Sequence, residues 1–148
     1  MTDPVLSSLL RINRMRMRML RQTTLAPHQY VGCMHLIVLH IGRCPGASQE
    51  DVAAFFALDK AGVARGARRL EEMGHLRREQ DPDNRRQYRL FLTEEGEGML
   101  RVLDGAHDRF QRRLSQGIDP ADWAMLASLL KRLEENSCRE ALPDGEDG

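Results

Sequence analysis

A short turn sequence, Asp-Pro-Asp-Asn at residues 81–84, separates two runs of strand-forming residues and limits the folds open to this chain. Proline presets the backbone for a tight turn, and the short side chains of Asp and Asn bond back to nearby backbone groups. The flanking runs, residues 75–80 and 87–93, have the aromatic, branched or alternating character typical of short strands. They predict one β-hairpin in a chain whose other segments have helical periodicity.

Two short helices are predicted directly before this hairpin. Ser48 is a good N-cap for a helix over residues 49–58, and Asp59 caps a second helix that starts at Lys60. Gly74 closes that second helix as its C′ residue. Two short helices followed by a hairpin form a helix-turn-helix with a wing.

The second of these helices has two distinct faces. At about 100° per residue, Val63, Ala67 and Leu70 point the same way, towards a core. The opposite face carries small and cationic side chains, namely Ala61, Ala64, Arg65 and Arg68. A slim cationic face suits entry into the major groove of DNA. Gly62 and Gly66 either add to this slimness or ease packing on a neighbouring helix.

Four longer helices are predicted around this unit. Residues 4–22 form an amphipathic basic helix, and residues 28–43 are apolar on most sides. Thr93 caps a helix whose apolar seam contains Leu100, Leu103, His107, Phe110 and Leu114, and Asp119 caps a last helix with Trp123, Leu126, Leu130 and Leu133. Both apolar seams need another apolar surface to cover them.

A formal net charge of zero hides a segregation of charge along the chain. Residues 60–89 contain nine basic and five acidic residues, a net of +4, whereas residues 134–148 contain six acids and one arginine, a net of −5. Only Lys60 and Lys131 are lysines, and the planar guanidinium of the other basic residues suits phosphates and guanine edges. The local field of the middle segment favours a nucleic-acid partner.

Other function classes lack their usual signatures. At 148 residues the chain has the length of one domain, without an apolar run near the roughly 20 residues that a membrane span needs and without a signal-peptide pattern. Three widely spaced cysteines favour reduced thiols. We therefore expect a cytoplasmic, non-enzymatic protein with no membrane contact, no catalytic residues, no cofactor and no metal.

The ordered motifs resemble the MarR family, the multiple-antibiotic-resistance type of bacterial transcription regulator. The family pattern LE..G matches Leu70, Glu71 and Gly74, its acidic D.R turn matches Asp83 with Arg85 and Arg86, and its LT..G matches Leu92, Thr93 and Gly96. The resemblance implies a mainly α fold with a small β-hairpin wing in a single domain over residues 1–148. Within it, residues 1–25 and 94–137 would be dimerisation helices, residues 27–93 the winged helix-turn-helix, and residues 138–148 an acidic, flexible tail.

The resemblance also implies a function. We expect a homodimer that binds double-stranded DNA at a pseudo-palindromic operator, acts as a repressor, and responds to a small molecule or another chemical signal. The alternative is a winged-helix dimer that acts mainly through protein–protein contacts. Arg85 corresponds to the family's minor-groove arginine, and Asp83 to the acid that braces the turn, with Arg77, Arg78 or Arg86 as its partner. The expected DNA-binding residues are Ser48, Lys60, Ala61, Ala64, Arg65, Arg68, Arg69, Asp83, Arg85 and Arg86.

Several side chains have two interpretations. His28, His35, His40 and Cys33 are imaginable metal ligands, but buried histidines and a packed cysteine explain them better. Cys44, beside Arg43, is the best candidate for a redox sensor. Met15, Met17, Met19 and Met34 line either an adaptable pocket or ordinary core. The arginines of the first helix, Arg11, Arg14, Arg18 and Arg21, either pair with the acidic tail or extend a phosphate-binding surface.

Overall fold

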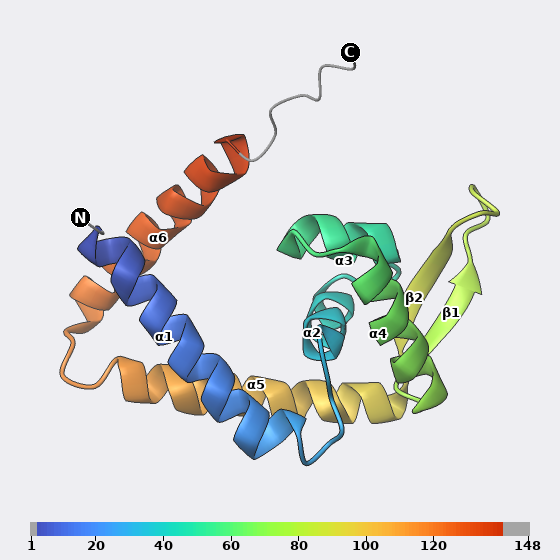
Figure 1. Cartoon of the computed structure of the whole chain (residues 1–148), viewed down its shortest axis with the longest axis horizontal. Helices are drawn as coiled ribbons and strands as arrows, with labels where there is room; N and C mark the ends of the chain where they lie inside the picture. The colour runs from blue at the N-terminus through green and yellow to red at the C-terminus, as the bar shows by residue number, and fades with distance from the viewer. Residues whose placement is uncertain (1–2, 141–148) are drawn as a thin grey trace. The chain divides into compact units, whose positions relative to one another are not determined.

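The structure is a computed structural model that describes residues 3–140. It contains two compact units, which divide between Phe110 and Gln111, within α5 (Glu94–Leu114). The first unit holds the predicted winged helix-turn-helix, and the mainly α fold with one hairpin is confirmed (Figure 1). The single-domain organisation stays a prediction. Among the described residues, no helix is long and apolar enough to cross a membrane.

The first helix ends earlier than its periodicity predicts. α1 (Pro4–Leu20) begins at Asp3, whose carboxylate accepts hydrogen bonds from the backbone N–H groups of Val5 and Leu6. The chain then continues as a π-helical turn, η1 (Arg21–Leu25). Periodicity could not separate the two forms, because a widened turn continues the same run of helical residues.

The second helix is also shorter than predicted, and it starts six residues later. α2 runs over Met34–Arg43, whereas residues 28–33 form turns in which Gln29 and Gly32 have left-handed backbone angles, with φ of 60° and 56°. Tyr30 is buried there, and its hydroxyl lies 2.6 Å from Nδ1 of His75. Burial raises the pKa of Tyr30 and lowers that of His75, so the hydrogen bond joins two groups whose neutral forms are favoured. This distant contact accounts for the shift of the helix start.

The helix-turn-helix forms as its capping residues predict. α3 (Gln49–Phe56) opens with a capping box between Ser48 and Asp51 and ends at Ala57, a left-handed residue with φ of 52°. α4 (Lys60–Glu72) begins at Asp59, whose carboxylate accepts from the N–H of Gly62. At its end, N–H groups of Gly74 and the next residue bond back into the last turn.

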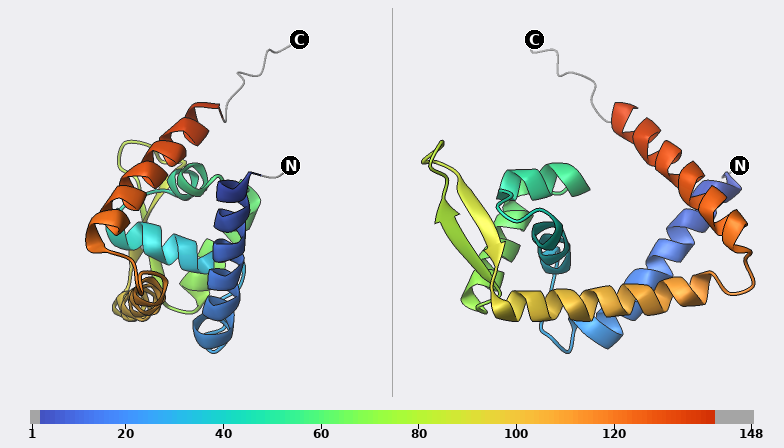
Figure 2. Two further views of the ribbon diagram at one scale, coloured as in Figure 1. Left: turned by 90° about the vertical axis from the view of Figure 1, so that its left-hand side faces the viewer. Right: turned by 180° about the vertical axis from the view of Figure 1, so that it is seen from behind.

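The hairpin pairs β1 (Leu76–Gln80) with β2 (Tyr88–Leu92) in antiparallel register. Leu76 and Leu90 are buried, and the backbone of Leu90 also exchanges two hydrogen bonds with Gly46 and Ala47. These contacts hold the inner end of the hairpin against the helices. Its outer end extends away from them (Figure 2).

The core of the first unit lies between α2, α3, α4, the hairpin and α5. Its fully buried side chains come from all five segments, namely Met34, Ile37, Val38, Ile41, Val52, Val63, Leu70, Leu90 and Leu103. α6 (Pro120–Glu140) belongs to the second unit and begins where Asp119 accepts from the N–H of Ala121. The helix includes residues 138–140, which were predicted to belong to the acidic tail. Residues 141–148 lie outside the described residues.

Gly96 marks the junction of the hairpin with α5. Thr93 caps this helix, accepting from the N–H of Gly96, and donates its hydroxyl to the carbonyl of Gly74. This closes the start of α5 onto the turn after α4. A Cβ atom on Gly96 would collide with the carbonyl oxygen of His75, which is backbone and cannot rotate away.

We predict that Gly96→Ala lowers the free energy of unfolding by about 1–3 kcal/mol, since overpacking must displace that backbone. Chemical denaturation measures the loss. Gly98→Ala is the matched control: its Cβ would meet only Arg101 Nη2, at 3.7 Å, so the better helix propensity of Ala should stabilise the fold by up to about 1 kcal/mol. Equal effects of the two substitutions would contradict the role given to Gly96.

His35 is a buried histidine between α1, α2 and α5. It is 3% exposed, and neither ring nitrogen has a hydrogen-bond partner among the described residues. Burial, reinforced by the positive charges of Arg16 and Arg21 and by His107, lowers the pKa of His35 to about 4. Arg16 itself donates to Nε2 of His107 over 3.4 Å. The folded protein therefore holds His35 neutral.

This arrangement predicts acid sensitivity. Below pH 6.5 the unfolded chain protonates His35 while the folded chain does not, so stability is lost as the pH falls towards 4. The loss attributable to this group is up to about 3 kcal/mol. We expect His35→Leu to flatten the dependence of the free energy of unfolding on pH between 6.5 and 4. The same slope in both proteins would show that another group is responsible.

Candidate nucleic-acid interface

The two faces of α4 are arranged as its sequence predicts. Val63, Ala67 and Leu70 are fully buried, whereas Arg65 and Arg68 are exposed on the opposite side. Lys60, Ala61 and Arg69 are exposed as well, and Ala64 is half-buried. The helix therefore presents a row of cationic side chains separated by small ones to solvent.

Gly66 does not contribute to that slim outer face. It is buried, and a Cβ atom there would lie 2.9 Å from Cδ1 of Ile37 and 3.4 Å from Sγ of Cys33. The missing side chain lets α4 approach α2, so the packing interpretation holds for this glycine. The interpretation that placed Gly66 beside a groove wall is wrong, because Gly66 lies three residues after Val63 and four before Leu70, on the same buried face of the helix.

Ser48 is a structural cap. It is 4% exposed, its backbone N–H donates to Asp51, and its hydroxyl accepts from the N–H of Asp51. Both polar groups are therefore occupied within the protein. Its burial gives no support to a direct contact with DNA.

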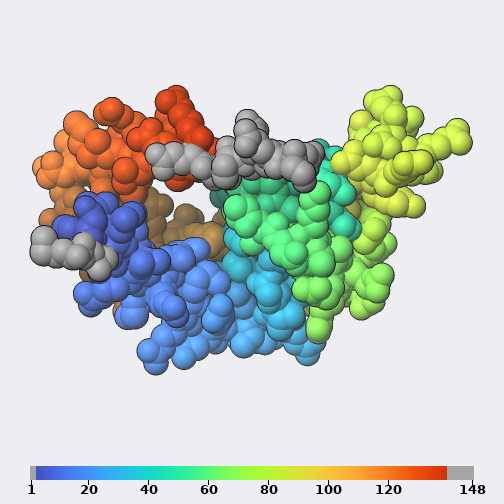
Figure 3. Space-filling model, turned by 45° about the horizontal axis from the view of Figure 1, so that its top comes forward, coloured from blue at the N-terminus to red at the C-terminus, as the bar shows by residue number. Residues whose placement is uncertain are grey.

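The tip of the hairpin carries Arg85 and Arg86 in exposed positions. The turn is closed by a backbone hydrogen bond from the N–H of Asp81 to the carbonyl of Gln87, and the carboxamide of Asn84 accepts from the N–H of Arg86. In the space-filling view, the hairpin tip projects from the surface of its unit (Figure 3). The two arginines are thus free to meet a ligand.

The acid that braces this turn is Asp81, and the ion pair expected for Asp83 is absent from the described residues. The carboxylate of Asp81 accepts from the N–H of Asp83 and lies 3.6 Å from Arg89. Two arginines proposed as partners of Asp83 are paired elsewhere, Arg77 with Glu79 and Arg78 with Glu71. The two acids lie two residues apart, so only the register of the hairpin distinguishes them.

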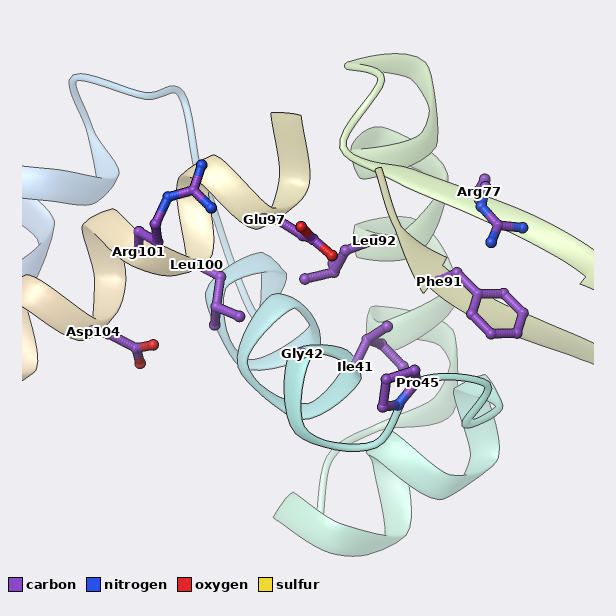
Figure 4. Close-up of a pocket in the computed structure, with 10 residues that line it drawn as sticks. All are labelled: Ile41, Gly42, Pro45, Arg77, Phe91, Leu92, Glu97, Leu100, Arg101 and Asp104. Carbon is purple, nitrogen blue, oxygen red and sulfur yellow. The ribbon is translucent and has the colours of Figure 1, made fainter. Parts of the chain in front are cut away.

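A pocket of about 310 Å³ lies at the base of the hairpin, between α2, β2 and α5 (Figure 4). Ile41, Leu92 and Leu100 contribute apolar side chains. At its edge the guanidinium of Arg77 lies 4.5 Å from the centre of the Phe91 ring. This packing supports the inner end of the hairpin.

A second pocket, of about 430 Å³, adjoins the exposed cationic face of α4. Residues 31–34, at the start of α2, line one side and α4 the other, with Arg65 and Arg69 among the lining residues. Cys33 lies within it, half-buried, and its thiol is 3.6 Å from the carbonyl of Gly62. Burial raises the pKa of this thiol, although a backbone hydrogen bond and Arg65 oppose the shift. Cys33 is therefore a packed cysteine whose neutral thiol form is favoured.

The histidines and cysteines of the described chain do not gather into a metal site. No group of three His, Cys, Asp or Glu side chains within residues 3–140 is placed to hold a metal ion. His40 packs its ring 4.9 Å from that of Phe55. Cys44 is exposed, as a redox sensor requires, but its reactivity stays a prediction.

Comparison with known proteins agrees with the fold and the motifs. The family model described as the MarR family matches residues 35–87. The HTH-type transcriptional regulator BilQ of Clostridioides difficile (strain CD3) is 24% identical over 106 residues, which cover 72% of each protein. The HTH-type transcriptional regulator TtmR of Methylorubrum extorquens (strain PA1) is 30% identical over 83 residues, covering 56% of this chain and 43% of TtmR.

Solved structures extend the likeness to nearly the whole chain. The crystal structure of MarR superposes with a TM-score of 0.76 and 31% identity, covering 93% of this chain and 99% of that one. A Listeria monocytogenes protein, described as a MarR family transcriptional regulator complexed with 26mer DNA, has a TM-score of 0.84 at 21% identity, covering 92% and 89% of the two chains, and so shares the fold. The relatives are transcriptional regulators and not enzymes. The chain therefore belongs to the MarR family of transcriptional regulators and carries its DNA-binding winged helix.

Proposed function

We propose that this protein is a sequence-specific transcriptional repressor that binds a pseudo-palindromic operator as a homodimer, in the cytoplasm, and is modulated by a chemical signal. The observation that carries the proposal is the pairing of two exposed cationic features in one compact unit, the outer face of α4 and the tip of the hairpin. A recognition helix in a major groove with a wing at the flanking minor groove uses both. The DNA in the Listeria complex supports this assignment.

We assign the exposed side chains to two groups, those that contact base edges and those that contact phosphates. Arg65 and Arg68 suit base edges, where a guanidinium can contact guanine with two hydrogen bonds. Ala61 and Ala64 offer methyl groups to thymine in place of hydroxyl contacts. Phosphate contacts are assigned to Lys60, Arg69 and Arg86, minor-groove insertion to Arg85, and a position near the DNA backbone to Asp83.

Exposed apolar side chains on the outer helices support the homodimer. Met15 on α1 is 64% exposed, and Met125 on α6 is 61% exposed. Large apolar side chains also point to solvent at Val5, Leu6, Leu10, Leu126, Leu129 and Leu133. Exposed apolar side chains gathered on a helix are typical of an interface. A two-fold dimer explains why the operator should contain two half-sites about one helical turn apart.

The pocket beside α4 is the proposed site of the chemical signal. A ligand with an acidic group could engage Arg65 and Arg69 there, so that its binding competes with DNA for the same arginines. A coupling free energy of about 1–3 kcal/mol between the two ligands would give partial release of the operator.

The salt dependence of binding tests the function. If a dimer neutralises about eight phosphates, the logarithm of the binding constant should fall with the logarithm of salt concentration with a slope near −7. Fluorescence anisotropy with a labelled duplex, selected from random DNA, measures this slope. A response independent of salt, or binding to a protein partner that excess duplex leaves unchanged, would favour the alternative in which the winged helix contacts proteins.

Arg85 tests the role of the wing. A·T-rich minor grooves are narrow and strongly negative, so insertion of Arg85 should favour operators with A·T-rich flanks. We expect Arg85→Ala to weaken binding to A·T-flanked operators more than to G·C-flanked ones, measured as the ratio of the two affinities. Equal weakening on both flanks would reduce Arg85 to a phosphate ligand.

A further inference from the structure

One side-chain contact joins the recognition helix to the middle of the wing. Nε of Arg78, on β1, donates to the carboxylate of Glu71, in the last turn of α4, over 2.8 Å. The Arg78 guanidinium also lies 5.8 Å from the centre of the Tyr88 ring on β2. A carboxylate on one side and an aromatic face on another restrict its position. We refer to this contact as the Glu71–Arg78 tie.

The other ion pairs of the hairpin join residues within the hairpin and do not involve α4. Two further ion pairs are internal to the hairpin: Arg77 pairs with Glu79 along β1, and Asp81 pairs with Arg89 across the strands. They stiffen the hairpin without attaching it to anything else. The Glu71–Arg78 tie is the ion pair that fixes the hairpin to α4.

The Glu71–Arg78 tie lies between the buried inner end of the hairpin and its tip, so a change at the tie can move the tip. Leu76 and Leu90 bury the inner end of the hairpin, and the chain between α4 and β1 is a short turn through Gly74, whose φ is 79°. Arg78 lies outward of that buried end, and its side chain is 27% exposed. Each further strand residue advances about 3.3 Å, so a small rotation at Arg78 displaces Arg85 by a larger distance.

We propose that the Glu71–Arg78 tie sets the angle of the wing relative to the recognition helix, and thereby determines how strongly the protein discriminates between flanking sequences. Glu71 is then a specificity-determining positioning residue that itself contacts no DNA. The inference rests on the proposed function, because flank discrimination requires Arg85 to enter a minor groove while α4 occupies the neighbouring major groove.

The rival role for Arg78 is that of an additional phosphate ligand, and the two roles predict different effects of one substitution. Glu71→Gln removes a negative charge and releases Arg78. If Arg78 binds phosphate, this variant should bind every duplex more tightly. If the tie orients the wing, the variant should lose discrimination between flanks in spite of its more favourable charge.

The experiment compares Glu71→Gln with Glu79→Gln. Both neutralise a carboxylate paired with an arginine of β1, but only the first breaks the link to α4. For Glu71→Gln we expect the affinity ratio between A·T-flanked and G·C-flanked operators to fall about two- to fivefold, the range that exposed ion pairs support. For Glu79→Gln the ratio should stay at the wild-type value. A wild-type ratio in Glu71→Gln, or equal losses in both variants, would overturn the proposal.

Amide hydrogen exchange of the protein without DNA provides an independent readout. We expect the amides of β2 to exchange about two- to fivefold faster in Glu71→Gln, because the outer hairpin has lost its ion pair with α4, and to keep their wild-type rates in Glu79→Gln. The double variant Glu71→Arg with Arg78→Glu should recover slow exchange. Unchanged exchange rates in Glu71→Gln would contradict the proposal that the Glu71–Arg78 tie holds the wing in position.

The two readouts separate the inference from the proposed function. Failure of the wild-type protein to bind any duplex would overturn the proposed function, and the exchange rates would still decide whether the tie holds the wing. Normal duplex binding with an unchanged flank ratio and unchanged exchange would leave the proposed function intact and overturn the inference.

Discussion

The close approach of α4 to α2 at Gly66 is the contact on which the functional surface depends. With a hydrogen in place of a side chain, the backbone of α4 comes near Ile37 and Cys33, and Val63, Ala67 and Leu70 enter the core. The rotation of the helix about its own axis is thereby set, since its apolar residues occupy one side only. Arg65 and Arg68 face solvent as a consequence of this packing.

A second set of contacts positions the inner end of the hairpin. The turn after α4 shares a hydrogen bond with Tyr30 in the loop before α2, accepts another from the hydroxyl of Thr93, and lies against the backbone of Gly96. Three segments that are distant in sequence thus meet at Gly74 and His75. These contacts and the burial of Leu76 and Leu90 hold the inner end of the hairpin, whereas its outer end relies on exposed interactions such as the Glu71–Arg78 tie.

The distribution of charge explains how a chain of zero net charge can present a cationic surface. Several acids in and beside the middle segment have structural partners: Asp59 caps α4, Asp81 braces the turn, and Glu71 and Glu79 hold arginines of β1. The arginines left exposed without an ion pair in the described residues include Arg65, Arg68, Arg85 and Arg86. Because some arginines are paired, the unpaired positive charge of the middle segment is concentrated on the outer face of α4 and at the tip of the hairpin.

The sequence by itself determined the elements whose signals are local. Capping by Ser48, Asp59, Thr93 and Asp119, the turn at residues 81–84, and the inward face of α4 all follow from neighbours within a few residues, so the fold class and the exposed cationic residues were predictable. Tertiary contacts set the start of α2, the neighbours that Gly66 meets, the identity of Asp81 as the brace and the partner of Arg78. Each of these depends on a side chain or backbone group brought close by folding, such as His75 for Tyr30 and Ile37 for Gly66, and periodicity contains no information on such distant neighbours.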